Sequence, residues 1–489
     1  MHRVLLIDET LRLIFDFCLS FYGSKKLLCD MALCCKAWKN PALDCIWRDL
    51  PSAVPLMALL PGFSLGMGTI RLEKSLRDVN LTTFYAYANR VKSIHFRHEI
   101  MVSPDTWAYL CNTGHLLPNL QTCHIKGTTM VDPRSCTSIS PRLKEFSLDV
   151  SYAVTGSNSG LIRDVLLWLG ENRSLRCLTV RGYNTACLRQ PFSTLVTLRS
   201  LSFHLSIVTE STFMAISSLP VLSWLDIHAS SLSFGRLSSA VMNHCGRGTP
   251  FFPSLSVLKI RARLPVIELV LRHIPRNNLV ALHMDIVNRG QPIPWHSTLL
   301  TITAASSKLR DLTIDDTEFN DAPRATRPYP VDYMLTMDDL RLLSKLPLEL
   351  LQLDVPHVPD LTDADIEEIV TWWPCLQWLG LGSDMALENM HPAWQPKLTL
   401  ASLSTLGKGC RELNELVITL DVASAVPQIS CEGHEQLGLL VISSRSKPNA
   451  ESLPVFIKTL FPYLTEVTPG YVGDYMDAWN TVEDNFDCL

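Results

Sequence analysis

One short pattern recurs along most of the chain and constrains its fold more than any other feature. The pattern is apolar-x-x-apolar-x-apolar, and the copy at Leu120, Cys123 and Ile125 is typical. A single copy arises often by chance, whereas a dozen in order do not, so the pattern predicts a repeat architecture. The clear copies begin at Leu120, Leu143, Leu175, Leu198, Leu222, Leu255, Leu279, Leu309, Leu348, Leu376, Leu413 and Leu437, with a first copy at Val91 and a shortened last copy at Leu464.

The spacing of the copies indicates which repeat this is. Between Leu120 and Leu255 the copies are separated by 23, 32, 23, 24 and 33 residues. A leucine-rich repeat has a period of about 20–29 residues with a strand at this motif, so the longer gaps require inserted loops. We expect amphipathic helices between the strands, for example over residues 161–169 and after the capping residues Thr336 and Thr362. The sequence therefore predicts an α/β fold, a curved solenoid with one strand and one helix per repeat, in which each fully buried Leu or Ile contributes roughly 1.5–3 kcal/mol.

Composition narrows the functional class. The chain has 489 residues, of which 47% are hydrophobic and 19% charged, which is typical of a globular protein. The net charge of −5 argues against a nucleic-acid partner, which requires a concentrated basic face. No apolar run approaches the roughly 20 residues that cross a bilayer, and the N-terminus lacks the apolar core of a secretory signal. We expect a cytoplasmic or nuclear protein with no membrane partner.

The cysteines give no sign of a metal or disulfide framework. Fifteen cysteines are scattered without a Cys-x-x-Cys pair, and the adjacent Cys34 and Cys35 suit neither a zinc site nor an easy disulfide. We interpret them as reduced cysteines that act as small hydrophobic residues. No metal and no cofactor is expected.

The first fifty residues differ from the repeats. Apolar residues at positions 7, 11, 14, 15 and 18 have helical spacing. Ser24 is expected to cap a second helix that carries Trp38 on its apolar face, and Asn40 followed by Pro41 predicts the start of a third helix that carries Trp47. A unit of about fifty residues is marginal by itself and cannot bury this many apolar groups internally. The surplus implies a partner.

These residues resemble a known family. Ile7, Thr10 and Cys34 stand where the family prefers proline, isoleucine and valine, and the resemblance covers roughly residues 4–61. The family that these residues resemble is the F-box. The run from Asn40 to Asp44 resembles the large F-box sets of mushroom-forming fungi. The repeats resemble the irregular leucine-rich repeats that follow F-boxes. The matching positions are Leu6, Ile7, Glu9, Leu11, Ile14, Phe15, Cys35, Lys36, Trp38, Ile46 and Trp47.

The resemblance implies a function. F-box proteins of this kind are substrate-recognition subunits of Skp–cullin–F-box ubiquitin ligases: the F-box docks a Skp-type adaptor, which links it to the cullin and RING subunits, and the repeats bind a target protein. The alternative is a leucine-rich-repeat interaction scaffold with a drifted F-box, outside any ligase. The candidates for adaptor contact and for the core of the small domain are Leu6, Ile7, Leu11, Ile14, Phe15, Trp38 and Trp47.

The resemblance and the repeat together predict four segments. Residues 1–50 form the F-box and residues 51–88 connect it to the repeats, which run over residues 89–468. Residues 469–489 form an acidic C-terminal tail. Since end repeats need covers, the F-box with the connecting segment is expected to cover one end and the tail the other.

A strip of charged residues is the predicted target surface. Strand side chains alternate, so the residues that flank the last apolar position of each motif project from the concave face. The alternatives are an ordinary solvated face, or contacts made by the long segments 316–334 and 384–399, where Trp394 is either a contact anchor or packs back on the solenoid. The strip is basic and then acidic: Lys259, Arg261, His283, Asp285, Asp315 and Asp354.

Two motifs have the spacing of a catalytic or metal site, but their surroundings do not fit that chemistry. Ser64, in the Gly62–Gly66 segment, has nucleophile-elbow spacing, but that chemistry needs a strand before the serine and a helix after it, and Pro61 precedes the segment. His95 and His98 resemble a metal pair, yet residues three apart on a strand point to opposite faces. The sequence predicts no enzyme.

Overall fold

The chain forms two compact units, Met1–Leu222 and Ser223–Leu489. Among the described helices, none combines the length and hydrophobicity that crossing a bilayer requires. The computed structural model describes residues 7–19, 21, 24–66, 69–72, 80–96, 101–102, 116–127, 140–151, 158–183, 188–246, 248–287, 293–316, 334–355, 358–382, 387, 390, 394–428, 433–470 and 473–488.

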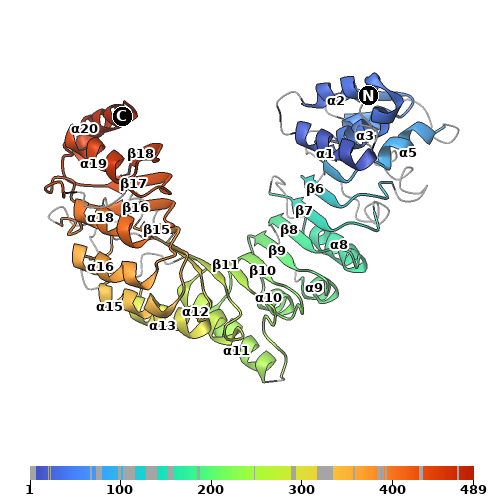
Figure 1. The fold of residues 1–489 in the computed structure, drawn as a ribbon. Coiled ribbons are helices and arrows are strands. Elements are labelled where there is room, and N and C mark those ends of the chain that lie inside the picture. Colours follow the sequence, from blue (N-terminus) through green and yellow to red (C-terminus); the bar gives the residue numbers. More distant parts are fainter. Residues whose placement is uncertain are drawn as a thin grey trace. The chain divides into compact units, whose positions relative to one another are not determined.

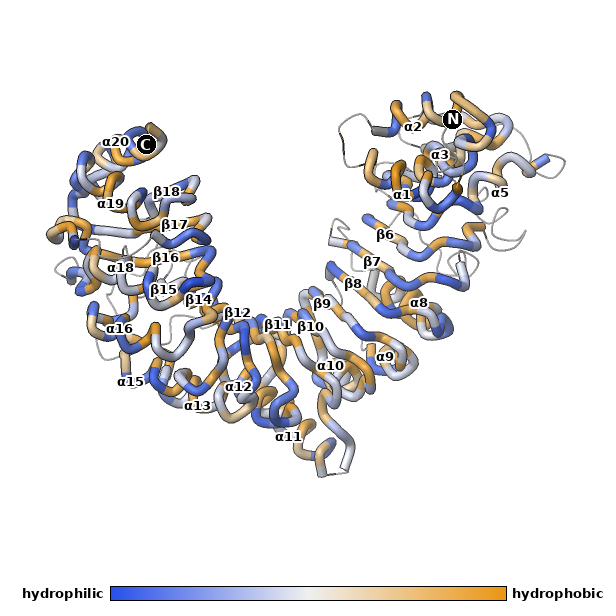
Figure 2. Tube along the Cα trace, viewed as in Figure 1, coloured by the Kyte–Doolittle hydropathy of each residue, from blue (hydrophilic) through white to orange (hydrophobic). Residues whose placement is uncertain are grey.

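Three short helices open the first unit: α1 (Asp8–Cys18), α2 (Ser24–Cys34) and α3 (Lys36–Arg48). Figure 1 shows them grouped at the N-terminal end of this unit, and Figure 2 shows hydrophobic stretches in their traces. Because each helix offers an apolar face, the three enclose a small core of their own. Its buried residues are Leu11, Phe15, Leu28, Ala42 and Cys45, against which Cys18, Leu19, Met31, Ala32, Trp38 and Ile46 pack.

The third helix begins at Lys36, so the predicted start at Asn40 is wrong. The chain breaks at Cys35, whose backbone is extended (φ −159°, ψ 164°), and Pro41 lies inside the helix. Asn40 does not cap the helix, since its backbone and side-chain oxygens both accept hydrogen bonds from the Arg90 guanidinium, at 3.2 and 3.0 Å. Trp38 therefore belongs to α3 and not to the second helix.

The first unit contains six parallel strands in the order β1-β4-β6-β7-β8-β9. Its first strand pairs with β4 and follows α3 directly, so the sheet begins within the segment predicted as F-box. A small separate sheet joins β2 (Phe63–Gly66), β3 (Thr69–Leu72) and β5 (Met101–Val102). The other elements are β1 (Asp49–Leu50), α4 (Val54–Met57), α5 (Thr82–Ala88), β4 (Ser93–Phe96), β6 (Thr122–Lys126), β7 (Glu145–Asp149), α8 (Asn158–Glu171), β8 (Cys177–Gly182), α9 (Arg189–Thr194), β9 (Ser200–Leu205) and α10 (Glu210–Ser217).

The second unit contains nine parallel strands, β10 to β18, in sequence order. Helices separate most of the strands. The elements are β10 (Trp224–His228), α11 (Phe234–Cys245), β11 (Val257–Ala262), α12 (Leu264–His273), β12 (Ala281–Ile286), α13 (Trp295–Ala305), β13 (Asp311–Asp315), α15 (Met337–Leu340), η4 (Arg341–Lys345), β14 (Leu350–Asp354), α16 (Asp363–Trp372), β15 (Trp378–Leu381), α18 (Leu400–Gly409), β16 (Glu415–Thr419), β17 (Leu439–Ser443), α19 (Ser452–Leu460), β18 (Glu466–Pro469), η5 (Gly473–Tyr475) and α20 (Met476–Asp487).

Each copy of the sequence pattern coincides with a strand, which confirms the predicted leucine-rich-repeat fold. Within each unit the described helices cover one face of the sheet, and none of them lies on the other face, called the open face below (Figure 1). The apolar motif residues point toward the helices and are buried. The Phe146 ring of β7, for example, meets the Trp168 ring of α8 at 5.9 Å, and the Trp373 Nε1–H donates to the Leu346 carbonyl at 3.1 Å.

Two predicted helix starts, and a helix that covers the C-terminal end of the repeats, are also present. Thr336 with Asp339, and Thr362 with Asp365, form reciprocal capping boxes at α15 and α16. The predicted acidic tail contains η5 and the helix α20, which packs on α19 and so covers the last repeat. Its buried residues are Trp479, Val482 and Phe486. The segment boundaries at residues 50, 88 and 468 stay predictions.

Candidate binding surfaces

The predicted adaptor residues separate into core and surface. Leu11 and Phe15 are each 1% exposed and form the module's core, in which the Phe15 and Trp38 rings meet edge-on at 6.0 Å. Trp47 lies 4.5 Å from the Tyr87 ring of α5. Leu6 lies outside the described residues, and direct contact of any of these side chains with an adaptor stays a prediction. Two of the predicted residues are exposed: Ile7 (47%) and Ile14 (37%).

A group of exposed apolar residues on and beside α1 and α2, called the exposed apolar face below, includes five residues that the sequence analysis did not propose for the adaptor. Leu13 is 72% exposed and Phe17, one helical turn further, is 70% exposed; Leu33 of α2 is 84% exposed. Single exposed apolar residues are normal, but here seven of the nineteen large exposed apolar side chains of the described chain fall within residues 7–33. Their spacing along α1 was the available signal. The seven are Ile7, Leu13, Ile14, Phe17, Phe21, Leu27 and Leu33.

Ion pairs fix the helices that carry this face. Arg12 of α1 bridges Asp8, at 2.7 Å, and Asp44 of α3, at 2.5 Å. Arg48 of α3 pairs with Asp16 of α1 at 2.6 Å. Since these pairs are partly exposed, each contributes little to stability. They link α1 to α3, whereas Leu13 and Phe17 of α1 stay exposed.

The open face of the second unit brings the predicted target residues together. Lys259, His283 and Thr313 lie side by side on β11, β12 and β13, and the next row runs through Arg261, Asp285, Asp315 and Asp354. All are exposed or half-buried, as the alternation predicted. Whether they bind a target stays a prediction.

One ion pair and one hydrogen bond connect residues of this strip. Arg261 lies 3.7 Å from Asp285, and the His283 Nε2 lies 2.6 Å from the Asp315 Oδ2. The other oxygen of that carboxylate, Asp315 Oδ1, is buried and has no hydrogen-bond partner among the described residues. Asp311, half-buried on the same face, has its carboxyl pKa raised by burial and then by the nearby charge of Glu349. Negative charge is therefore concentrated on β12, β13 and β14.

An apolar group beside the acidic strip was also missed. Trp378 of β15 is half-buried between Leu350 and Glu415 on the neighbouring strands, and its Nε1–H is buried without a hydrogen-bond partner among the described residues. Gly380, two residues along, carries no side chain, and Val417 lies next to it on β16. The same alternation places these residues on the open face: Gly380 and Val417 flank the last apolar position of their motifs, and Trp378 lies one alternation earlier.

On the open face of the first unit, two histidine rings stack on each other. The His95 and His124 rings of β4 and β6 stack at 4.3 Å, and burial, followed by the charge of His95, lowers the pKa of His124. His98 lies outside the described residues.

Ser64 lies in β2, which pairs with the antiparallel strand β3, so no helix follows it and the nucleophile-elbow geometry is not formed.

Trp394 packs back on the repeats. It lies against a small cluster made by Met334, Val358, Leu387 and Met390. The Arg445 guanidinium holds the segment by donating hydrogen bonds to the backbone carbonyls of residues 387, 390 and 394. Most of the segments 316–334 and 384–399 lies outside the described residues, so their role as contact loops stays a prediction.

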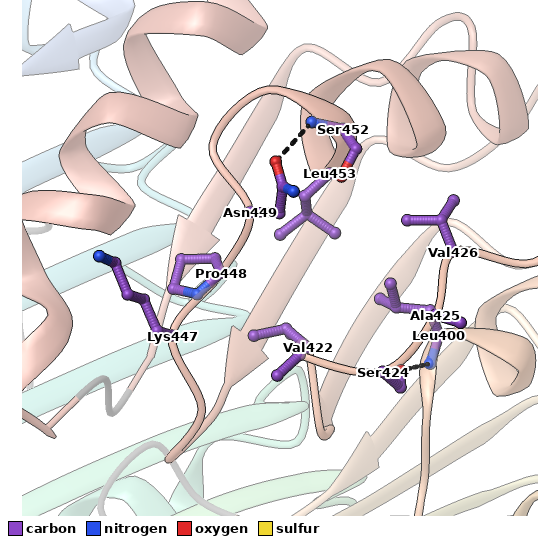
Figure 3. A pocket seen from close by; sticks show the side chains of 11 residues that line it. Leu400, Val422, Ser424, Ala425, Val426, Lys447, Pro448, Asn449, Ser452 and Leu453 are labelled. Atoms are coloured by element: carbon purple, nitrogen blue, oxygen red, sulfur yellow. Dashed lines mark hydrogen bonds between the residues drawn. The ribbon is translucent and has the colours of Figure 1, made fainter.

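A cavity of about 460 Å³ lies between the loops that follow β16 and β17. Figure 3 shows that its polar groups are already used: the Asn449 side chain accepts from the Ser452 N–H at 3.0 Å, and the Leu400 N–H donates to the Ser424 hydroxyl at 3.4 Å. The Lys447 amino group points away from it (Figure 3). The cavity is thus a hollow between loops without convergent polar groups that would orient a ligand.

Comparisons with known proteins give no closer assignment. No protein-family model matches the chain, and no curated protein matches it. Among solved structures, an internalin from Listeria monocytogenes is similar with 13% identity and a TM-score of 0.35, over 84% of this chain and 89% of that chain. The mouse RP105/MD-1 complex is similar with 15% identity and a TM-score of 0.35, over 78% of this chain and 60% of that chain. The strand order and register of the chain itself establish the repeat fold.

Proposed function

We propose that the chain is the substrate receptor of a Skp–cullin–F-box ubiquitin ligase that acts in the cytoplasm or nucleus. The N-terminal helices dock a Skp-type adaptor, and the repeats hold a target protein. Such a receptor does no bond chemistry: it raises the local concentration of target lysines near the charged conjugating enzyme.

The exposed apolar face of α1 and α2 carries this proposal. The module has a complete core without Leu13, Phe17 and Leu33, yet leaves them 70% or more exposed. Exposed groups of this density mark a protein interface. The F-box resemblance, which arises from other residues of the same helices, supplies the adaptor as the partner.

The test is direct binding of the full chain to a purified recombinant Skp-type adaptor, measured by calorimetry. Leu13→Ser, Phe17→Ser and Leu33→Ser should each weaken binding, by about tenfold or more where the residue is a hot spot, and the triple variant should abolish it. The matched control is Met242→Ser, which removes an equally exposed (64%) apolar residue from α11. Substitutions at Leu11 or Phe15 are unsuitable because they disrupt the core.

Two results would contradict the proposal. If the triple variant binds the adaptor as tightly as wild type, the docking surface is elsewhere. If the wild-type chain does not bind at micromolar concentration, the second candidate, a scaffold outside any ligase, is favoured. The support for the second candidate is that Ile7 and Thr10 stand where the F-box family prefers proline and isoleucine.

A further inference from the structure

We propose that the open face of strands β12 to β17 binds an extended segment of the target that carries basic residues and one large apolar residue. This deepens the proposed function, on which it rests, by naming the chemistry of the target. The surface is called the acidic–apolar face below. It consists of Asp285, Asp311, Asp315, Leu350, Asp354, Trp378, Gly380, Glu415, Val417, Leu439 and Val441.

Charge determines which kind of partner fits. Across the open-face positions of five adjacent strands, β12 to β16, there is no lysine or arginine, and five positions are acidic. The His283 Nε2 lies 2.6 Å from the Asp315 carboxylate, and Arg261 of the neighbouring strand β11 lies 3.7 Å from Asp285, so acidic groups still outnumber basic ones on this face. Carboxylates stacked on neighbouring strands repel one another, so a partner that brings positive charge gains more here than on a mixed surface. The acidic residues are Asp285, Asp311, Asp315, Asp354 and Glu415.

Two buried polar atoms that have no hydrogen-bond partner among the described residues point to hydrogen bonds that a ligand would complete. Asp315 Oδ1 can accept from an arginine or lysine side chain, and Trp378 Nε1–H can donate to a backbone carbonyl of an extended chain. A buried polar atom left without a partner is costly, which favours a ligand that supplies one.

The apolar part of the acidic–apolar face provides the contact for the large apolar residue of the target segment. Trp378 lies beside Leu350, and tryptophan is among the residues most often found at the energetic centre of interfaces. Gly380 is buried beside the Gln352 side chain, which would lie 3.4 Å from a Cβ built there. A ligand side chain can therefore rest on the exposed part of the half-buried indole, beside Leu350.

The sheet geometry sets the spacing in the ligand. Asp285, Asp315 and Asp354 are on three successive strands, which spans about 10 Å. Trp378 is one strand beyond and four residues back along the strand, roughly 14 Å from Asp354 by the usual strand dimensions. An extended chain covers that distance in about four residues. The expected segment has two basic residues at alternate positions and an apolar residue about four positions away.

The probe is a fluorescein-labelled peptide with arginine at its first and third positions, leucine at its seventh and serine elsewhere. Its binding to the full chain is followed by fluorescence anisotropy at low and at physiological ionic strength. We expect the arginine peptide to bind at least about tenfold more tightly than a counterpart with glutamates in place of both arginines, with a preference that shrinks as salt screens the charges.

Variants of the chain locate the site. Asp315→Asn with Asp354→Asn, and separately Trp378→Ala, should each weaken peptide binding by about tenfold. Glu367→Gln is the matched control for charge, because Glu367 is exposed on α16, away from the open face, and should leave binding unchanged. Trp378→Phe keeps an aromatic ring and should retain most of the affinity, which separates loss of the anchor from loss of folding.

The same proteins are also tested for adaptor binding, which keeps the two proposals apart. Equal affinity for the arginine and glutamate peptides, or unchanged binding by the aspartate and tryptophan variants, overturns this inference even when the adaptor still binds. Loss of adaptor binding by wild type overturns the ligase proposal and leaves the peptide result to stand by itself as evidence for an interaction scaffold.

Discussion

The N-terminal helices and the repeats place their apolar residues differently. In the repeats, Leu282 and Leu312 sit in register on adjacent strands, each 1% exposed or less, and every copy receives part of its cover from the next. In α1, Phe15 is buried but Phe17 is 70% exposed. A repeat can add neighbours until its apolar residues are covered, whereas a module of about fifty residues cannot. The difference leaves the module with exposed apolar residues, on which the docking proposal rests.

The largest expected effect tests this comparison within one helix. Phe15→Ala should destabilise the module by about 3–5 kcal/mol, because it removes a buried ring from a small core. Phe17→Ala should change stability by no more than about 0.5 kcal/mol, because the ring is already in solvent. Amide hydrogen exchange over residues 8–48 measures both. Similar loss of protection in the two variants would show that Phe17 supports the fold and is not held for a partner.

The repeats could be predicted well because every copy has the same environment. The strand at each motif follows from apolar residues that alternate toward the helices, and Thr336 and Thr362 form the capping boxes that their local sequence indicates. The start of the third helix could not be predicted in this way. Asn40 is bound by Arg90, fifty residues away, and no local pattern contains that contact.

The binding surfaces were only partly predictable. The sequence indicated a surplus of apolar residues in the first helices, but it could not separate residues of the module's core, such as Leu11 and Phe15, from residues that contact an adaptor. The two apolar sides of α1 look alike in sequence, and the contact with α3 decides which of them is buried. On the open face the charged strip was correctly placed, whereas Trp378 was missed because it lies one alternation earlier in the motif.

A smaller effect tests how closely neighbouring repeats approach. Gly409 of α18 faces Val370 of α16, and a Cβ built at Gly409 would lie 2.4 Å from the Val370 Cβ. Gly409→Ala should therefore cost about 1–3 kcal/mol through overpacking. Gly235→Ala in α11 meets nothing within 4 Å and should stabilise by roughly 0.4–1 kcal/mol by restricting the unfolded chain. Urea unfolding compares the two. Equal, small effects on stability would mean that the helices of adjacent repeats are loosely packed at Gly409. The contrast between closely packed repeats and an incompletely covered N-terminal module would then be weaker.

The smallest effect concerns buried polar groups: the repeats bury several polar side chains, whereas the buried core cluster of the N-terminal module is apolar. His434 is 2% exposed; its Nε2 lies 2.9 Å from the Cys410 carbonyl, and its Nδ1 accepts from the Gln436 N–H at 3.3 Å. The ring therefore carries its proton on Nε2 and is neutral. Burial, followed by the charge of Arg411, lowers the pKa of His434, while the bond to Cys410 opposes this shift.

The direction of the pH effect follows from that shift. In the unfolded chain His434 titrates near its ordinary pKa of about 6.5, whereas in the folded chain it resists protonation. Its contribution to stability is complete above about pH 6.5 and is lost as the pH falls toward the lowered pKa of the folded state, because the unfolded chain then binds the extra proton. Urea unfolding of the second unit from pH 7.5 to pH 5 should show this loss. His434→Gln should begin less stable but lose less as the pH falls. Parallel curves for the two proteins would show that other groups, at the surface as in the module, govern the acid sensitivity of the repeats.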